Sequence, residues 1–308
     1  MISALILALV PIALLIMLGL WLRHANFVGE AFWPYAEKLG YYVLLPALFF
    51  HSLATAQLGD LPVQAMVSVL VVSTVAVAAV MVLARRLFPV DDPAFTSLFQ
   101  GGVRFNNYVG VTAAAGIFGA HGIALAAIAN AAIVPTVNIL CVLVFARYGA
   151  GSRPTLASVL KQLALNPLLL ACALGMLVRG SGLAIPPGLA PALQALGQAS
   201  LPLGLLCIGA ALHLRSVRGW LKPIGTSSVI KFVAMPLVTV LICRLFGLEG
   251  EAALAAVLFQ TLPTASSAYI MARQLGGDAP LMAAIIAGQT LLAALAMPLV
   301  VLATTPLL

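Results

Sequence analysis

Polar residues gather in one otherwise apolar stretch of the chain, at 95–117. Arg104 is followed closely by Asn106 and Asn107, and glycines precede it. The planar guanidinium of an arginine can bind both oxygens of a carboxylate, and amide groups can add neutral donors. If the stretch spans a membrane, an arginine at its centre costs about 2.5–3.5 kcal/mol and normally faces a cavity or a partner. The pattern predicts an organic-anion site, with contact between Arg104 and an interface or backbone carbonyls as the structural alternative.

A second interrupted stretch, at 250–273, contains Pro263 followed by Thr264, Ser266 and Ser267. Proline removes a helical N–H donor and clashes with the preceding turn, so we expect a helix break at Pro263. The hydroxyl groups could repair the freed backbone groups, as is common in membrane helices. They could instead line a binding site. Interrupted segments at corresponding places of two halves are the best sequence indication of a transporter site, which favours the second interpretation.

Other polar residues inside apolar stretches are candidates as well. We assign Asn138 to the substrate site, because it shares a helix face with Asn130, eight residues earlier. Hydrogen bonding between helices explains both asparagines equally well. Lys231 could extend its amine to the inner membrane surface. The secondary candidates are Asn130, Lys231, Gln260 and Gln289.

The elements that must position these residues are membrane helices. Of the 308 residues, 63% are hydrophobic and 7% charged, too few charges to cover a water-facing surface. This excludes a soluble enzyme, a disordered chain and a nucleic-acid binder. A span needs about 20 apolar residues. The apolar runs predict ten spans, at 2–22, 33–55, 63–88, 95–117, 121–146, 157–178, 190–212, 223–246, 250–273 and 280–305.

Catalytic and metal-binding motifs are not visible in the sequence. It contains no G-x-S-x-G, H-E-x-x-H or P-loop pattern, and its four cysteines stand alone in apolar runs. We therefore expect no enzyme, no catalytic residue, no metal, no cofactor and no ATP drive within this chain. No Asp or Glu falls in the middle of a predicted span, which argues against a sodium/proton antiporter.

The positive charges predict the orientation of the spans. With the N-terminus outside, the inner loops hold eleven Lys and Arg residues, and the outer loops hold two, Arg179 and Arg244. Because cytoplasmic loops are enriched in Lys and Arg, both termini are expected outside the cell.

The chain also shows an internal match at a spacing of 156 residues. Pro11 matches Pro167, and Gly19 matches Gly175. Two halves of five spans each must enter the membrane from opposite faces, which is an inverted repeat. We expect a first five-helix repeat at 1–148 and an inverted second repeat at 149–308, with no soluble domain.

Several motifs along the whole chain resemble those of the auxin efflux carrier family in its bacterial branch, which includes malonate and malate permeases. The motifs are Lys38-Leu-Gly-Tyr-Tyr-Val-Leu-Leu-Pro46, Arg104-Phe-Asn106-Asn107-Tyr-Val-Gly110, Asn166-Pro167, Leu201-Pro202 with Gly209, Leu262-Pro263-Thr-Ala, Gly276-Gly277-Asp278 and Met297-Pro298-Leu.

The resemblance implies an all-α polytopic fold of ten helices, in which broken helices 4 and 9 cross at the midplane. It implies a scaffold part of helices 1, 2, 6 and 7 and a transport part of helices 3–5 and 8–10. The crossover positions that it implies are Gly110, Thr112 and Pro263. Thr112 stands where relatives usually have proline, so span 4 is open to a break at its Gly and Asn residues instead.

The leading functional expectation is a secondary carrier that moves a small organic anion, a carboxylate by this reasoning, across the bacterial cytoplasmic (inner) membrane by alternating access. One alternative is a sodium-coupled symporter of the bile-acid-transporter type, and another is a non-transporting membrane scaffold or sensor. Coupling to sodium or to protons stays open. The expected partners are the small-molecule anion and membrane lipid, without nucleic acid, and a homodimer is an open alternative.

Overall fold

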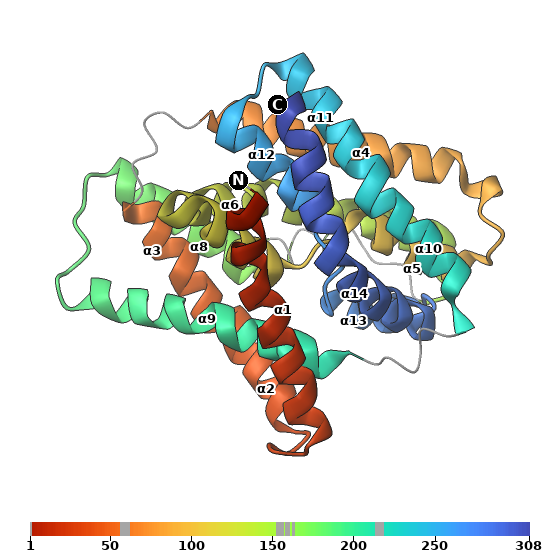
Figure 1. Cartoon of the computed structure of the whole chain (residues 1–308), viewed down its shortest axis with the longest axis horizontal. Coiled ribbons are helices and arrows are strands. Elements are labelled where there is room, and N and C mark those ends of the chain that lie inside the picture. Colours follow the sequence, from red (N-terminus) through yellow and green to blue (C-terminus); the bar gives the residue numbers. More distant parts are fainter. Residues whose placement is uncertain (1, 56–61, 152–156, 158–160, 162–163, 213–218) are drawn as a thin grey trace. The chain divides into compact units, whose positions relative to one another are not determined.

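The computed structural model describes residues 2–55, 62–151, 157, 161, 164–212 and 219–308. Within these ranges the regular structure is entirely helical (Figure 1). The helices are α1 (Ile2–His24), α2 (Phe32–Leu39), η1 (Gly40–Leu44), α3 (Leu45–Thr55), α4 (Val63–Leu83), η2 (Arg85–Leu87), α5 (Asp92–Val103), α6 (Asn107–Tyr148), α8 (Pro167–Gly180), α9 (Leu189–Ala211), α10 (Leu221–Val229), η4 (Ile230–Ala234), α11 (Met235–Phe246), α12 (Gly250–Gln260), α13 (Ser267–Leu275), α14 (Ala279–Thr304) and η5 (Thr305–Leu307).

The all-helical expectation is confirmed for the described residues, and each predicted span is mainly helical over its described part, with interruptions at 104–106 and 261–266. Two spans contain a π-helical turn: η1 joins α2 to α3, and η4 joins α10 to α11. The described ranges hold five helical stretches that are long and apolar enough to cross a membrane. These are Val63–Leu83, Asp92–Tyr148, Leu189–Ala211, Leu221–Phe246 and Ala279–Leu307. Val10–His24, Pro167–Gly180 and Gly250–Gln260 are apolar but shorter, and the full count of ten crossings stays a prediction.

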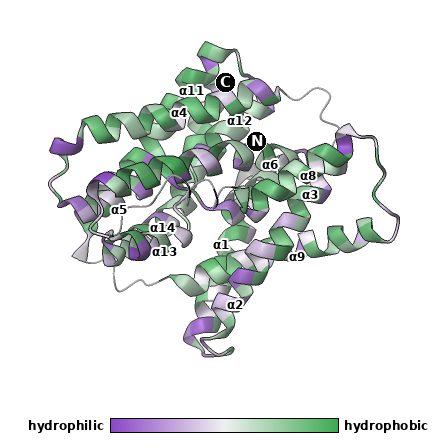
Figure 2. Ribbon diagram, turned by 180° about the vertical axis from the view of Figure 1, so that it is seen from behind, coloured by the Kyte–Doolittle hydropathy of each residue, from purple (hydrophilic) through white to green (hydrophobic). Residues whose placement is uncertain are grey.

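The helix surfaces are apolar in a way that suits lipid. Hydrophobic residues follow one another along α4 and α11, while hydrophilic residues gather near helix ends (Figure 2). On α11 the exposed leucines Leu237, Leu241 and Leu245 recur every four residues and so share one face. A continuous exposed apolar face marks a surface that contacts lipid or another protein.

The chain divides into two compact units. Unit 1 comprises Met1–Leu61, Tyr108–Ala131 and Gln162–Ala211, and unit 2 comprises Pro62–Asn107, Ala132–Lys161 and Leu212–Leu308. In unit 1, α1 packs against α9, and α3 packs against both α8 and α9 (Figure 1). In unit 2, α4 packs against α11, and α5 packs against α10 and α14.

Glycine allows the closest helix approaches in unit 1. A Cβ atom at Gly19 of α1 would collide with the backbone of Leu206 in α9. A Cβ atom at Gly175 of α8 would lie 2.8 Å from the carbonyl oxygen of Phe50 in α3. Any larger residue at either position would force the paired helices apart.

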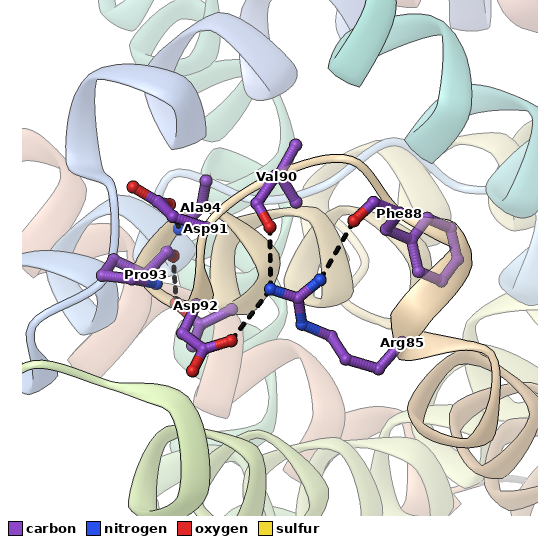
Figure 3. Close-up of polar contacts among 8 residues, drawn as sticks. Arg85, Phe88, Val90, Asp91, Asp92, Pro93 and Ala94 are labelled. Carbon is purple, nitrogen blue, oxygen red and sulfur yellow. Dashed lines mark hydrogen bonds and ion pairs between the residues drawn. The ribbon is translucent and has the colours of Figure 1, made fainter.

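Hydrogen bonds around Arg85 hold the segment that leads into α5 in unit 2 (Figure 3). The guanidinium of Arg85 donates to the carbonyl oxygens of Phe88 (3.0 Å) and Val90 (2.7 Å), and to the carboxylate of Asp92 (2.8 Å). Asp91 caps α5, because its carboxylate accepts the backbone N–H of Ala94 at 2.9 Å. This cap sets where α5 begins, one helix length before the polar residues at its other end.

The break in the predicted span 95–117 lies earlier than the crossover positions implied by the family pattern. The backbone leaves the helix at Arg104–Asn106, whereas Gly110 and Thr112 are both helical within α6. Thr112 fits the helix because its hydroxyl donates to the carbonyl oxygen of Tyr108, four residues back, at 2.7 Å. Gly110 and Thr112 therefore lie within helix, and the interruption at Arg104–Asn106 agrees with the alternative of a break at the Gly and Asn residues. In α6 itself the conformation becomes non-helical only at Gly119 (φ 61°, ψ −141°).

Candidate functional site

Two helices of unit 2 end in irregular polar segments. α5 ends at Val103, and Arg104 follows with an extended backbone (φ −76°, ψ 159°). α12 ends at Gln260, and the segment from Leu262 to Ala265, which includes Pro263, carries no regular structure before α13 begins. The buried Pro263 therefore lies within a helix break, as its missing N–H requires.

Gln289 of α14 joins the two breaks. Its side-chain nitrogen donates to the carbonyl oxygen of Gly101 at 2.9 Å and to the hydroxyl of Ser227 at 3.4 Å. Its side-chain oxygen accepts from Thr264 twice, from the backbone N–H at 3.1 Å and from the hydroxyl at 2.8 Å. Gln289 and Thr264 are both fully buried. Through these bonds Gln289 and Thr264 connect α5, α10 and the break before α13 into one polar cluster.

Arg104 lies at the edge of the same region and is half-buried. One terminal nitrogen donates to the side-chain oxygen of Asn138 at 3.1 Å and lies 3.5 Å from the sulfur of Met271. The other donates to the hydroxyl of Ser267, the first residue of α13, at 3.3 Å. No carboxylate in the described part of the chain pairs with this guanidinium. The structure therefore brings the predicted residues Asn138 and Ser267 into contact with Arg104, whose charge is not balanced by an acid among the described residues.

The remaining predicted site residues are near the breaks but not all in contact with Arg104. Asn106 is buried in the first break. Asn107 begins α6, and its side-chain oxygen has no hydrogen-bond partner among the described residues. Ser266 caps α13.

Three secondary candidates lie elsewhere. Asn130 belongs to unit 1, where its side-chain nitrogen donates to Ala126 of its own helix at 2.9 Å. Gln260 is buried, and its side-chain nitrogen donates to the hydroxyls of Ser73 (2.9 Å) and Thr74 (2.8 Å), tying α12 to α4. Lys231 is fully buried in η4.

Sequence reasoning missed two groups that hold the breaks together. The side-chain nitrogen of Gln100 donates to the carbonyl oxygen of Ala268 in α13 at 3.3 Å. Its position one helical turn before Arg104 was a usable signal. The second group is the pair Ser73 and Thr74, whose role depends on contact with Gln260, far away in sequence. Within the described residues, no cluster of three or more His, Cys, Asp or Glu could hold a metal ion.

The site therefore offers a guanidinium that pairs with no carboxylate of the described residues and lies beside the start of α13, where the helix dipole carries partial positive charge. Such an arrangement suits an anion. Its setting in apolar helices places it in a membrane protein.

Comparison with known proteins gives a consistent result. The family described as "Membrane transport protein" matches residues 4–301. A protein of Rhizobium meliloti (strain 1021) named "Putative malonate transporter" is 27% identical over 277 residues, which cover 85% of this chain and 84% of that protein. Because the family match runs through nearly the whole chain, this multi-pass membrane protein belongs to the membrane transport protein family, the auxin efflux carrier family.

Proposed function

We propose that this protein is a secondary carrier for a small organic carboxylate, with malonate as the first substrate to test. One observation carries the proposal: among the described residues Arg104 has no acidic partner, although it lies where two helix breaks of unit 2 meet. The name of the Rhizobium meliloti relative supports the substrate class. A transport role, rather than an enzymatic one, agrees with the family.

The chemistry of the site supports a carboxylate. An arginine has five N–H donors, and Asn138 and Ser267 accept from only two of its nitrogens. The remaining donors can meet a carboxylate in the fork geometry that arginine favours. The partial positive charge at the start of α13 adds to this attraction and replaces part of the hydration that the anion loses.

Alternating access is proposed from the division of the chain. Unit 1 contains the predicted spans 1, 2, 6 and 7, which we assign to the scaffold, together with Tyr108–Ala131 from the predicted spans 4 and 5. Unit 2 contains both helix breaks, which we assign to the transport part. Repeat-related contacts support the inverted duplication. Gly19 meets the backbone of Leu206, and 156 residues away from each partner Gly175 meets Phe50. Gly19 of the first half thus contacts Leu206 of the second half, and the equivalent Gly175 of the second half contacts the equivalent Phe50 of the first half.

A sodium-coupled symporter is the second candidate, because some buried oxygens at the breaks lack donors. In the described part of the chain the side-chain oxygens of Gln100, Asn107 and Gln260 have no hydrogen-bond partner. Carbonyl oxygens of this kind can bind a hard cation. A sodium gradient that drives malonate uptake would favour this candidate over an uncoupled or proton-coupled carrier.

The test is transport by the purified full chain in proteoliposomes of bacterial phospholipid. Vesicles loaded with unlabelled malonate should take up radiolabelled malonate by exchange, and protein-free vesicles should not. A membrane scaffold or sensor would exchange no malonate, whether or not it binds it. A panel of carboxylates in the same vesicles, each added as a competitor, would then define the preferred chain length.

A further inference from the structure

A lysine lies fully buried inside unit 2 with no partner. Lys231 belongs to the π-helical turn η4, its side chain is 0% exposed, and its amine finds no hydrogen-bond acceptor among the described residues. The hydroxyl of Ser228, three residues earlier, also lacks a partner there. π-helical turns inside α-helices are rare and are frequent at functional sites. The amine therefore does not extend to a membrane surface, contrary to the structural alternative considered from the sequence.

The helix that carries Lys231 runs close to the end of α5. A Cβ atom at Gly101 would lie 3.0 Å from the Cβ atom of Ser227, and one at Gly102 would lie 3.1 Å from Ile230. Ser227 also accepts from Gln289, the residue that joins the two breaks. Lys231 follows Ser227 by about one helical turn. It therefore lies on the same continuous helix as a residue of the polar cluster that holds the breaks together.

The helices packed against η4 offer no acid that holds the amine. η4 packs against α5 and α14 and continues into α10 and α11. Asp92 is bonded to Arg85, and the caps Asp91 and Asp278 accept backbone N–H groups of their own helices. α4 and α14 contain no charged residue. The other charged or titratable groups on these elements stand at helix ends: Lys222, Cys243, Arg244 and Arg104.

The buried position of Lys231 affects its charged ammonium form and its uncharged amine form differently. An ammonium group has three donors and no acceptor, and burying it unpaired costs several kcal/mol. An uncharged amine costs less to bury, although it too lacks a partner among the described residues. A positive charge here is favoured by the C-terminal end of α5 and by any anion that enters the site. In carriers with broken helices, the C-terminal ends of half-helices hold the coupling cation.

We propose that Lys231 is the proton-binding group that couples carboxylate transport to the proton gradient, in place of a sodium ion. This inference rests on the proposed carrier function. When the carboxylate binds, the lone pair of the Lys231 nitrogen takes one proton from water on that side of the membrane. When the carboxylate leaves, the ammonium returns the proton to water on the other side, and no covalent bond to substrate forms.

The experiment uses wild-type protein and two lysine variants in proteoliposomes, with malonate as the probe. Lys231→Met removes the amine with similar length and apolar character. Lys222→Met makes the same change at the exposed start of the same helix and is the control. Three activities are measured: exchange at equal pH, accumulation under a pH gradient at clamped voltage, and accumulation under a sodium gradient.

We expect wild type and Lys222→Met to accumulate malonate under the pH gradient and not under the sodium gradient. Lys231→Met should keep malonate exchange and lose pH-driven accumulation. A merely structural lysine would reduce both activities together or neither. In addition, the affinity of wild type for malonate should weaken between about pH 7 and about pH 9, by up to about tenfold per pH unit, the limit for one linked proton.

Each contrary result has a distinct meaning. Absence of malonate exchange by wild type would overturn the proposed function, and this inference with it. Exchange together with undiminished pH-driven accumulation by Lys231→Met, or with sodium-driven accumulation by wild type, would overturn the coupling role alone. If Lys231→Met does not fold, a malonate affinity of wild type that is constant over the same pH range contradicts the proposal without any variant.

Discussion

At the residue scale, Arg104 is distinguished by what it lacks. Its guanidinium is held by Asn138 and Ser267, both neutral, and no carboxylate in the described residues neutralises it. A structural arginine at membrane depth would be expected to have a paired acid or saturated carbonyl contacts. Arg104 keeps donors available beside the start of α13, an arrangement that suits an anion.

Replacing Arg104 should weaken malonate binding without unfolding the protein. Loss of a charged, hydrogen-bonded partner costs about 2–5 kcal/mol, so Arg104→Ala should raise the dissociation constant at least about thirtyfold. Arg104→Lys keeps the charge but loses the planar fork, so its dissociation constant for malonate should lie between those of wild type and Arg104→Ala. Titration calorimetry of the purified variants measures this.

The exposed Arg273 of α13 supplies the matched control, since Arg273→Ala removes the same charge from the same unit. If Arg104 only stabilised the fold, Arg104→Ala would lower the melting temperature and leave the affinity of the folded protein unchanged.

At the element scale, the joint between the helix breaks depends on Gln289. Its amide satisfies the carbonyl of Gly101 and both polar groups of Thr264. Gln289→Leu leaves these buried groups without partners, at about 1–3 kcal/mol for each orphaned group. We expect a lower melting temperature and weaker malonate binding, measured by thermal unfolding with and without malonate.

The control for this joint is Gln274→Leu, at an exposed position of α13. Equal melting temperatures for the two glutamine variants would mean that Gln289 does not hold the breaks.

The glycine contacts of the helix pairs give a third prediction. A methyl group at Gly175 would press on the backbone of Phe50, so Gly175→Ala should destabilise the protein by about 1–3 kcal/mol. Gly19→Ala should do the same at the repeat-related contact. Gly180→Ala, on the same helix as Gly175 but with open space around it, should be neutral or slightly stabilising. Thermal unfolding of the three variants checks this; a neutral Gly175→Ala would remove the contact argument for the repeat.

The elements were largely predictable from the sequence, because apolar runs and their punctuation reflect the bilayer directly. The region of the first helix break was predictable too, since Arg104 and its asparagines make a poor membrane helix. Its exact position was not, because Gly110 is helical and the hydroxyl of Thr112 is accommodated in α6 by the Tyr108 carbonyl. Pairings such as Gln289 with Gly101, or Gln260 with Ser73, join distant parts of the chain and leave no local pattern.

At the scale of the whole molecule, the orientation in the membrane follows from charge. Eleven Lys and Arg residues are assigned to the predicted inner loops and two to the outer loops, which predicts that both termini lie outside. Single cysteines added before residue 2 and after Leu308 should react with a membrane-impermeant maleimide in intact cells, and a cysteine at Arg86 should react only after permeabilisation. The native cysteines are all buried, which limits background labelling. Reaction of either terminus only after permeabilisation would refute the predicted orientation.

The whole account depends on Arg104 acting in transport. The most direct test is exchange of radiolabelled malonate in proteoliposomes that contain wild type, Arg104→Ala or Arg273→Ala at equal amounts of folded protein. Wild type and Arg273→Ala should exchange malonate at similar rates, and Arg104→Ala should fall to the rate of protein-free vesicles. Undiminished malonate exchange by well-folded Arg104→Ala would contradict the account.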